Sequence, residues 1–179
     1  MTAATQPAAT LSDVLAERLR GRGRGRGRVV LVGIGNPLLG DDAAGCLVAR
    51  GVKGTPGIDV IESDDVPERD VLRIADAQPD VVVLADAVDL GAPAGSVALL
   101  EPDALAGYAP TTHRVPLSLI ATLLRRAAAA DVLVLAIQPR QMAPGAGVSP
   151  EVARSVDALV GMIRGSSAHA AQALEEAPC

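Results

Sequence analysis

Residues 29–45 constrain the fold of this chain more than any other segment. They open with an uninterrupted apolar run at 29–32, which is typical of a strand buried on both faces of a sheet. Gly33 and Gly35 follow, and glycine allows the sharp change of direction that a chain needs on leaving a sheet. A helix is expected to begin a few residues later and to end near Gly51. The segment therefore predicts a buried strand, a glycine-rich turn and a helix.

A glycine-rich turn between a strand and a helix has two interpretations. The first is a nucleotide-binding turn, and Glu62 supports it because it ends a second strand-like run roughly where a ribose-binding acid would lie. Against it, Asp41 and Asp42 stand at the expected helix start, where a pyrophosphate needs bare N–H groups. Two carboxylates repel a phosphate and attract a cation. The segment therefore favours a cation site.

Composition limits both the core and the partners. The chain has 179 residues, of which 49% are hydrophobic, but it contains one Tyr and no Phe or Trp. A core of Val, Leu, Ile and Ala suits a parallel sheet covered by helices. The net charge of −5 argues against nucleic-acid binding. No apolar run approaches the roughly 18 residues of a membrane span, so we expect no membrane partner.

Cysteine content and chain length set the remaining expectations. Cys46 and Cys179 are the two cysteines, so no disulfide framework is expected and the cytoplasm is the expected location. Cys46 falls among apolar residues of the predicted helix and is interpreted as a small core residue. The length suits one domain, and we expect a monomer.

We expect that domain to be a single α/β unit at residues 29–165. Residues 1–28 are predicted to form a flexible arm with a short amphipathic helix and an Arg-Gly run from Arg20 to Arg28. Such a run could bind an acidic partner or nucleic acid, but a soluble tether is favoured because composition alone rarely specifies a partner. Residues 166–179 are predicted to form a loose tail, beyond a last helix that begins at Pro150.

The alternation of apolar runs and helical patterns predicts a three-layer α/β/α sandwich around a mostly parallel five-stranded sheet. Strands are expected at 29–33, 57–61, 80–85, 96–100 and 131–137, with the third of them central. Thr111 or Thr112 is expected to cap a helix that carries Pro116 in its first turn.

Ligands of such folds bind at the carboxyl ends of the parallel strands. Asp42 follows the first strand, Asp86 closes the third, and His113 is expected to open a helix at the same edge. Each has an ordinary structural explanation when taken singly, but together they form an oxygen- and nitrogen-rich set that suits a borderline transition metal. Asp41 and Asp89 are expected to serve as caps or outer hydrogen-bond acceptors.

Four blocks of this sequence resemble the nickel–iron hydrogenase maturation endopeptidases. The first is Gly-Ile-Gly-Asn-Pro-Leu-Leu-Gly-Asp-Asp at 33–42, and the others are Leu-Ala-Asp-Ala at 84–87, Thr-Thr-His at 111–113 and Ile-Gln-Pro at 137–139. The last two are most similar to the branch that processes formate-hydrogenlyase-type hydrogenases. The resemblance extends over about 29–164. Ala43 stands where the family usually has glycine, which leaves the exact course of the loop open.

The resemblance implies an endopeptidase that removes a short C-terminal extension from a hydrogenase large-subunit precursor once nickel has been inserted. The nickel carried by that substrate would be the recognition element. The metal-contacting and catalytic residues of the family fall on Asp42, Asp86 and His113, and Gly35, Asn36 and Asp41 belong to the supporting loop. No organic cofactor and no tightly bound metal of its own are expected.

The chemistry and two alternative functions stay open at this point. Nickel could polarise the scissile carbonyl or orient a water, or a carboxylate could act as general base while nickel positions the peptide. A covalent mechanism is not expected, because no Ser/His/Asp or Cys/His set with credible geometry is present. The alternatives are a non-catalytic nickel carrier or chaperone for the same precursor and a nucleotide-binding module.

Overall fold

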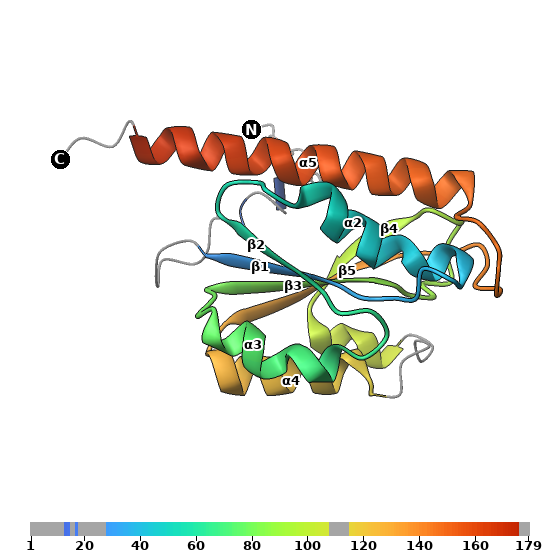
Figure 1. The fold of residues 1–179 in the computed structure, drawn as a ribbon, viewed down its shortest axis with the longest axis horizontal. Coiled ribbons are helices and arrows are strands. Elements are labelled where there is room, and N and C mark those ends of the chain that lie inside the picture. The colour runs from blue at the N-terminus through green and yellow to red at the C-terminus, as the bar shows by residue number, and fades with distance from the viewer. Residues whose placement is uncertain (1–12, 15–16, 18–27, 108–114, 176–179) are drawn as a thin grey trace, which may run out of the picture.

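A five-stranded sheet lies at the centre of the molecule between two layers of helices (Figure 1). The computed structural model describes residues 13–14, 17, 28–107 and 115–175. The strands are β1 (Val29–Gly33), β2 (Ile58–Glu62), β3 (Val81–Ala87), β4 (Val97–Leu100) and β5 (Asp131–Ile137), in the order β2-β1-β3-β5-β4. All neighbours run parallel except β4, which is antiparallel to β5. The predicted α/β/α sandwich with a mostly parallel sheet and a central third strand is confirmed.

The helices pack in pairs on the two faces of the sheet. α2 (Ala44–Val52) and α5 (Pro150–Glu175) cover one face, and α3 (Val71–Asp76) and α4 (Leu117–Ala128) cover the other (Figure 1). Three short 3₁₀ turns, η1 (Gly40–Ala43), η2 (Pro67–Asp70) and η3 (Pro102–Gly107), lead into or lie between these elements. Within the described residues, no helix is long and apolar enough to cross a membrane.

The core divides into two apolar clusters, one on each face of the sheet. Leu31 and Val83 point into the cluster that also holds the buried residues of α2 and α5. Val30 and Val82, their neighbours along the chain, point into the cluster beneath α3 and α4. Successive strand residues face opposite sides of a sheet, so a strand covered on both faces needs an unbroken apolar run. The prediction that β1 is buried on both faces is confirmed.

The structure corrects the predicted end of the last helix. We expected α5 to stop near Gly165 and residues 166–179 to be loose, but α5 continues to Glu175. Residues 166–175 are rich in alanine and contain neither proline nor a second glycine. A single helical glycine costs only about 1 kcal/mol relative to alanine. Gly165 is therefore too weak a signal to end the helix.

Two further predictions differ in detail or lie outside the described residues. α4 begins at Leu117, so Pro116 precedes the helix with an extended backbone (ψ 138°) rather than lying in its first turn. Thr111 and Thr112 lie outside the described residues. Of the N-terminal arm before residue 28, the structure describes only Asp13, Val14 and Glu17, and all three are helical.

Candidate active site

The turn between β1 and α2 is pressed tightly against the ends of β1 and β3. A side chain at Gly35, where φ is +131°, would place its Cβ 1.7 Å from the carbonyl oxygen of Asp42. A Cβ at Gly45 would lie 2.0 Å from the carbonyl oxygen of Ala85 and 2.4 Å from that of Ile34. These contacts leave no room for any side chain at either glycine. The glycines therefore bring the acidic turn η1 to the carboxyl edge of the sheet.

Asp42 is buried within this turn. Its Oδ2 accepts a hydrogen bond from the backbone N–H of Asn36, with an N···O distance of 2.7 Å. The side chain of Asn36 in turn accepts the N–H of Leu38 at 2.9 Å. Ala43, which follows the acid pair, has helical backbone angles (φ −66°, ψ −13°). Alanine is accommodated at this position because these angles do not require glycine.

Asp86 is fully buried near the end of β3. Its Oδ1 accepts the N–H of Ala87 at 2.9 Å. β1 and β3 are parallel neighbours, with Gly33 opposite Ala85, and η1 contacts β3. Asp42 and Asp86 thus lie at the same edge of the sheet, as their positions in the sequence predicted.

His113, the third predicted site residue, lies outside the described residues. Among the residues that are described, no three His, Cys, Asp or Glu side chains gather closely enough to hold a metal ion. The set of Asp42, Asp86 and His113 therefore stays a prediction.

Asp41, the neighbour of Asp42, binds the loop between β5 and α5. Its Oδ1 accepts the N–H of Ser149 at 2.6 Å, and its Oδ2 accepts the N–H of Arg140 at 2.8 Å, the N–H of Gln141 at 3.2 Å and the hydroxyl of Ser149 at 2.9 Å. Burial opposes ionisation of this carboxyl, but the hydrogen bonds outweigh it and lower its pKa. The expected role as a hydrogen-bond acceptor is confirmed, and the bound loop is one that sequence reasoning had not connected to it.

The backbone N–H groups of Gly35 and Asn36, in the glycine-rich turn, donate hydrogen bonds within the protein. Gly35 N–H donates to Asp64 O at 2.7 Å, and Asn36 N–H donates to Asp42. Glu62, the acid that a nucleotide-binding turn would need for ribose, pairs with Arg50 at 2.6 Å. A phosphate would find neither of these two donors free, and it would meet the negative charges of Asp41 and Asp42. This geometry argues against the nucleotide-binding module.

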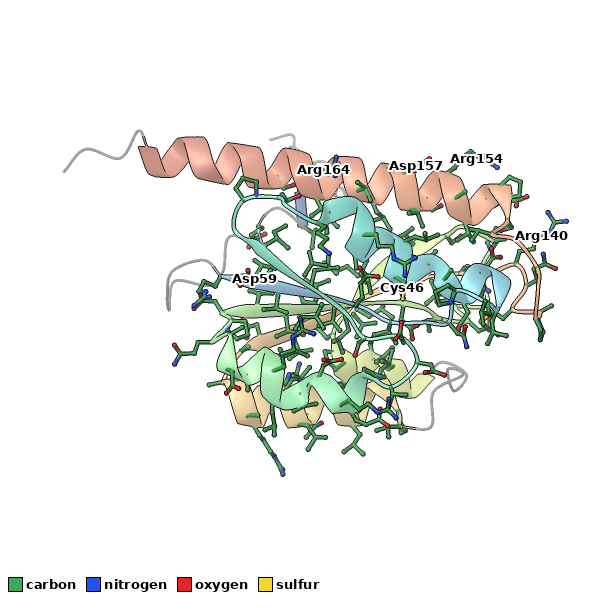
Figure 2. All side chains as sticks on the ribbon, in the orientation of Figure 1. Cys46, Asp59, Arg140, Arg154, Asp157 and Arg164 are labelled. Atoms are coloured by element: carbon green, nitrogen blue, oxygen red, sulfur yellow. The ribbon has the colours of Figure 1, made fainter. Side chains whose placement is uncertain are left out.

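Cys46 is a residue of α2 (Figure 2) and is fully buried. Its thiol donates to the carbonyl oxygen of Gly35, with an S···O distance of 3.3 Å. Burial raises the pKa of this thiol to about 11. Nucleophilic cysteines instead have lowered pKa values in partly exposed, electropositive surroundings. The interpretation of Cys46 as a core residue is confirmed by its burial.

Gln138 and Ser149 are two further buried polar residues at this edge of the sheet. The sequence analysis did not propose either of them as a functional residue. Gln138 was noted only as part of the Ile-Gln-Pro block, and Ser149 only as a helix cap. The available signal was a polar residue placed directly after the apolar strand at 131–137. A strand end buried at the carboxyl edge of a parallel sheet is a common position for binding residues.

Three comparisons with known proteins agree on one family. The family model described as hydrogenase maturation protease matches residues 49–166, a range that includes Asp86 and His113. The hydrogenase 3 maturation protease of Escherichia coli K12 is 34% identical over 113 residues, which cover 62% of this chain and 72% of that protein.

Solved structures of related proteins have the same fold. The crystal structure of the NiFe hydrogenase maturation protease HycI from Thermococcus kodakarensis KOD1 matches with a TM-score of 0.76 and 29% identity, covering 86% of this chain and 98% of that one. The solution structure of the endopeptidase HycI from Escherichia coli matches with a TM-score of 0.71 and 28% identity, covering 77% of this chain and 90% of that one.

Proposed function

The chain belongs to the hydrogenase maturation protease family, and from this premise we propose that it removes the C-terminal extension of a nickel-loaded hydrogenase large-subunit precursor. Proteases of this family act on hydrogenase large-subunit precursors, so the reaction class is peptide-bond hydrolysis. The finer part of the proposal is that nickel arrives as part of the substrate and serves as the recognition element. Cytoplasmic location remains part of the proposal, on cysteine content alone.

The observation that carries this proposal is the placement of Asp42 and Asp86. Both carboxylates are buried, and both lie where parallel strands β1 and β3 end. Carboxylates buried in proteins are hydrogen-bonded, paired with a cation or bound to a metal. Adding His113 from the segment that follows η3 would give two oxygen ligands and one nitrogen ligand, a set that suits nickel.

Two roles for these residues fit the arrangement. Nickel held by the precursor and contacted by the three side chains would polarise the scissile carbonyl or orient the attacking water. Alternatively, Asp42 or Asp86 would take a proton from that water while nickel only positions the peptide. Cys46 has no part in either route, because its buried thiol stays protonated.

The decisive experiment is mass spectrometry of the precursor before and after incubation with the protein. We expect a loss of mass equal to the C-terminal extension when the precursor carries nickel and no change when it does not. A nickel carrier or chaperone would bind the same precursor without shortening it. Intact nickel-loaded precursor after prolonged incubation with folded protein would contradict the proposal.

Substitutions test the three residues in the same assay. Asp42→Asn and Asp86→Asn keep an oxygen for the backbone N–H groups now bound, but remove the negative charge. Each of these two substitutions, like His113→Ala, is expected to abolish processing. The free energy of unfolding should change by only about 1 kcal/mol. Asp65→Asn alters an exposed carboxylate and serves as the control. Full processing by any two of the three variants would show that the set is wrong.

A further inference from the structure

The connection between β3 and β4, residues 88–96, folds around Gln138. The backbone of Gln138 is held by the far end of this loop. Gly95 N–H donates to Gln138 O at 2.9 Å, and Gln138 N–H donates to Ser96 O at 2.8 Å. These two bonds place the Gln138 backbone beside the start of β4.

The side-chain amide of Gln138 binds the near end of the same loop. Its Oε1 accepts the N–H groups of Leu90 at 2.6 Å and Ala92 at 3.3 Å. Its Nε2 donates to Asp89 Oδ1 at 3.2 Å and to Pro139 O at 3.1 Å. A primary amide offers two acceptor positions and two donors, and all four are used here. The residue is only 8% exposed, so water replaces none of these bonds easily.

This loop begins two residues after Asp86, directly after Ala87, the last residue of β3. β3 and β5 run side by side, with Asp86 opposite Ala136 and Ala87 opposite Ile137. The strand that carries Asp86 and the strand that ends at Gln138 thus reach the same edge together. Gln138 binds residues 89–92 and so holds the chain three to six residues after Asp86.

From this geometry we infer that Gln138 is a positioning residue of the proposed hydrolysis. It holds the loop that follows Asp86 and thereby sets where the Asp86 carboxylate lies relative to Asp42. The inference rests on the proposed function. A displacement of about 1 Å in a reacting group can cost on the order of 100-fold in rate. A residue that only holds such a group is therefore expected to change turnover more than substrate binding.

Three variants and one control test the inference. Gln138→Met keeps the length of the side chain and removes all four hydrogen bonds. Gln138→Glu keeps the acceptor for Leu90 and Ala92 but sets a carboxylate oxygen against Asp89. Adding Asp89→Asn to Gln138→Glu restores a donor opposite that oxygen. Gln78→Met is the control, because Gln78 is exposed at the opposite end of β3.

Cleavage of nickel-loaded precursor is measured as kcat and KM. We expect Gln138→Met to lower kcat by roughly 10- to 100-fold and to change KM by less than about twofold. Gln138→Glu should lower kcat similarly, and the added Asp89→Asn should recover at least part of the loss. Gln78→Met should cleave like the wild-type protein. Hydrogen exchange of residues 88–96 should become faster in Gln138→Met.

The contradicting outcomes separate the inference from the proposed function. If the wild-type protein does not cleave the precursor, the proposed function is wrong and the inference fails with it. If the wild-type protein and Gln78→Met cleave but Gln138→Met is equally fast, only the inference is wrong. A change confined to KM would also overturn it. Should Gln138→Met fail to fold, equal kcat values for Gln138→Glu with and without Asp89→Asn would decide against it.

Discussion

Asp41 and Asp42 are consecutive carboxylates with different surroundings. Asp41 binds three backbone N–H groups and the hydroxyl of Ser149 in a loop that is about a hundred positions away in the sequence. Asp42 binds the N–H of Asn36 within its own turn. Neighbouring side chains of a 3₁₀ turn leave the backbone in different directions. One acid of the pair can therefore anchor a distant loop while the other binds within its own turn, at the edge of the sheet that we propose as the active site.

Replacing Asp41 should destabilise the protein in a pH-dependent way. In Asp41→Asn an amide NH₂ would face a buried N–H, so we expect the free energy of unfolding at pH 7 to fall by about 2–4 kcal/mol. The pKa of Asp41 is lowered in the folded state, so its stabilising effect is present above the ordinary aspartate pKa. That effect is lost as the pH falls through the folded-state value.

Urea unfolding at pH 7, 5 and 3.5 measures this effect. The difference in unfolding free energy between the wild-type protein and Asp41→Asn should become smaller between pH 5 and pH 3.5, because the ordinary aspartate pKa of about 3.9 lies in this interval. Asp65→Asn, at an exposed position, should show little difference at any pH. A difference for Asp41→Asn that stays constant across the series would contradict the prediction.

Cys46 should be dispensable for activity. With a pKa of about 11, roughly one thiol in a thousand is ionised at pH 8, and the sulfur is buried. Thiol-blocking reagents are therefore expected not to inhibit processing. Cys46→Ala should stay active and lose about 1 kcal/mol of stability, because a small group and a weak hydrogen bond are removed. A folded but inactive Cys46→Ala protein would point to a cysteine-dependent mechanism instead.

At the scale of elements, the contact of α2 with the sheet depends on Gly45. Helix–sheet packing this close puts the helix backbone against the carbonyl oxygens of Ile34 and Ala85. Gly161, in the middle of α5, has no atom within 4 Å of a Cβ built on it. Both glycines lie within helices, so replacing either with alanine has a similar effect on helix propensity. A difference in stability between the two variants therefore measures the packing of α2 against the sheet.

Gly45→Ala should lower the free energy of unfolding by about 3 kcal/mol or more, because a Cβ there overlaps backbone atoms that cannot move aside. Gly161→Ala should leave stability unchanged or raise it by up to about 1 kcal/mol, since alanine is the better helix former. Differential scanning calorimetry of the two variants measures the contrast. Equal melting temperatures would mean that α2 can shift away from the sheet at little cost.

At the scale of the whole molecule, the proposed function implies that the precursor, and not this protein, carries the nickel. The proposed set of Asp42, Asp86 and His113 lacks the thiolates or additional imidazoles that make nickel or zinc binding tight. We expect the purified protein to contain little metal by elemental analysis and to keep its activity after dialysis against a chelator. Nickel-free precursor should stay uncut at any enzyme concentration. Tightly held stoichiometric metal together with cleavage of nickel-free precursor would instead indicate an ordinary metallopeptidase.

The sequence by itself determined the layers of the fold and the edge of the sheet at which Asp42 and Asp86 lie. Strands β1 and β3 can be predicted from the sequence because burial on both faces requires an unbroken apolar run, which is a local property. Asp42 and Asp86 could be assigned to one edge because parallel neighbouring strands bring their carboxyl ends together. Neither inference needs knowledge of a distant contact.

The tertiary structure alone decided the rest. The antiparallel direction of β4, the loop bound by Asp41 and the loop folded around Gln138 all depend on pairings between residues 34 to 108 positions apart. Such bonds leave no periodic pattern in the sequence, because a buried carboxylate or amide is satisfied by whichever backbone groups the folded chain brings to it. The extent of α5 is the exception, because a local property accounts for it: the helix propensity of the alanine-rich residues beyond Gly165 outweighs one glycine.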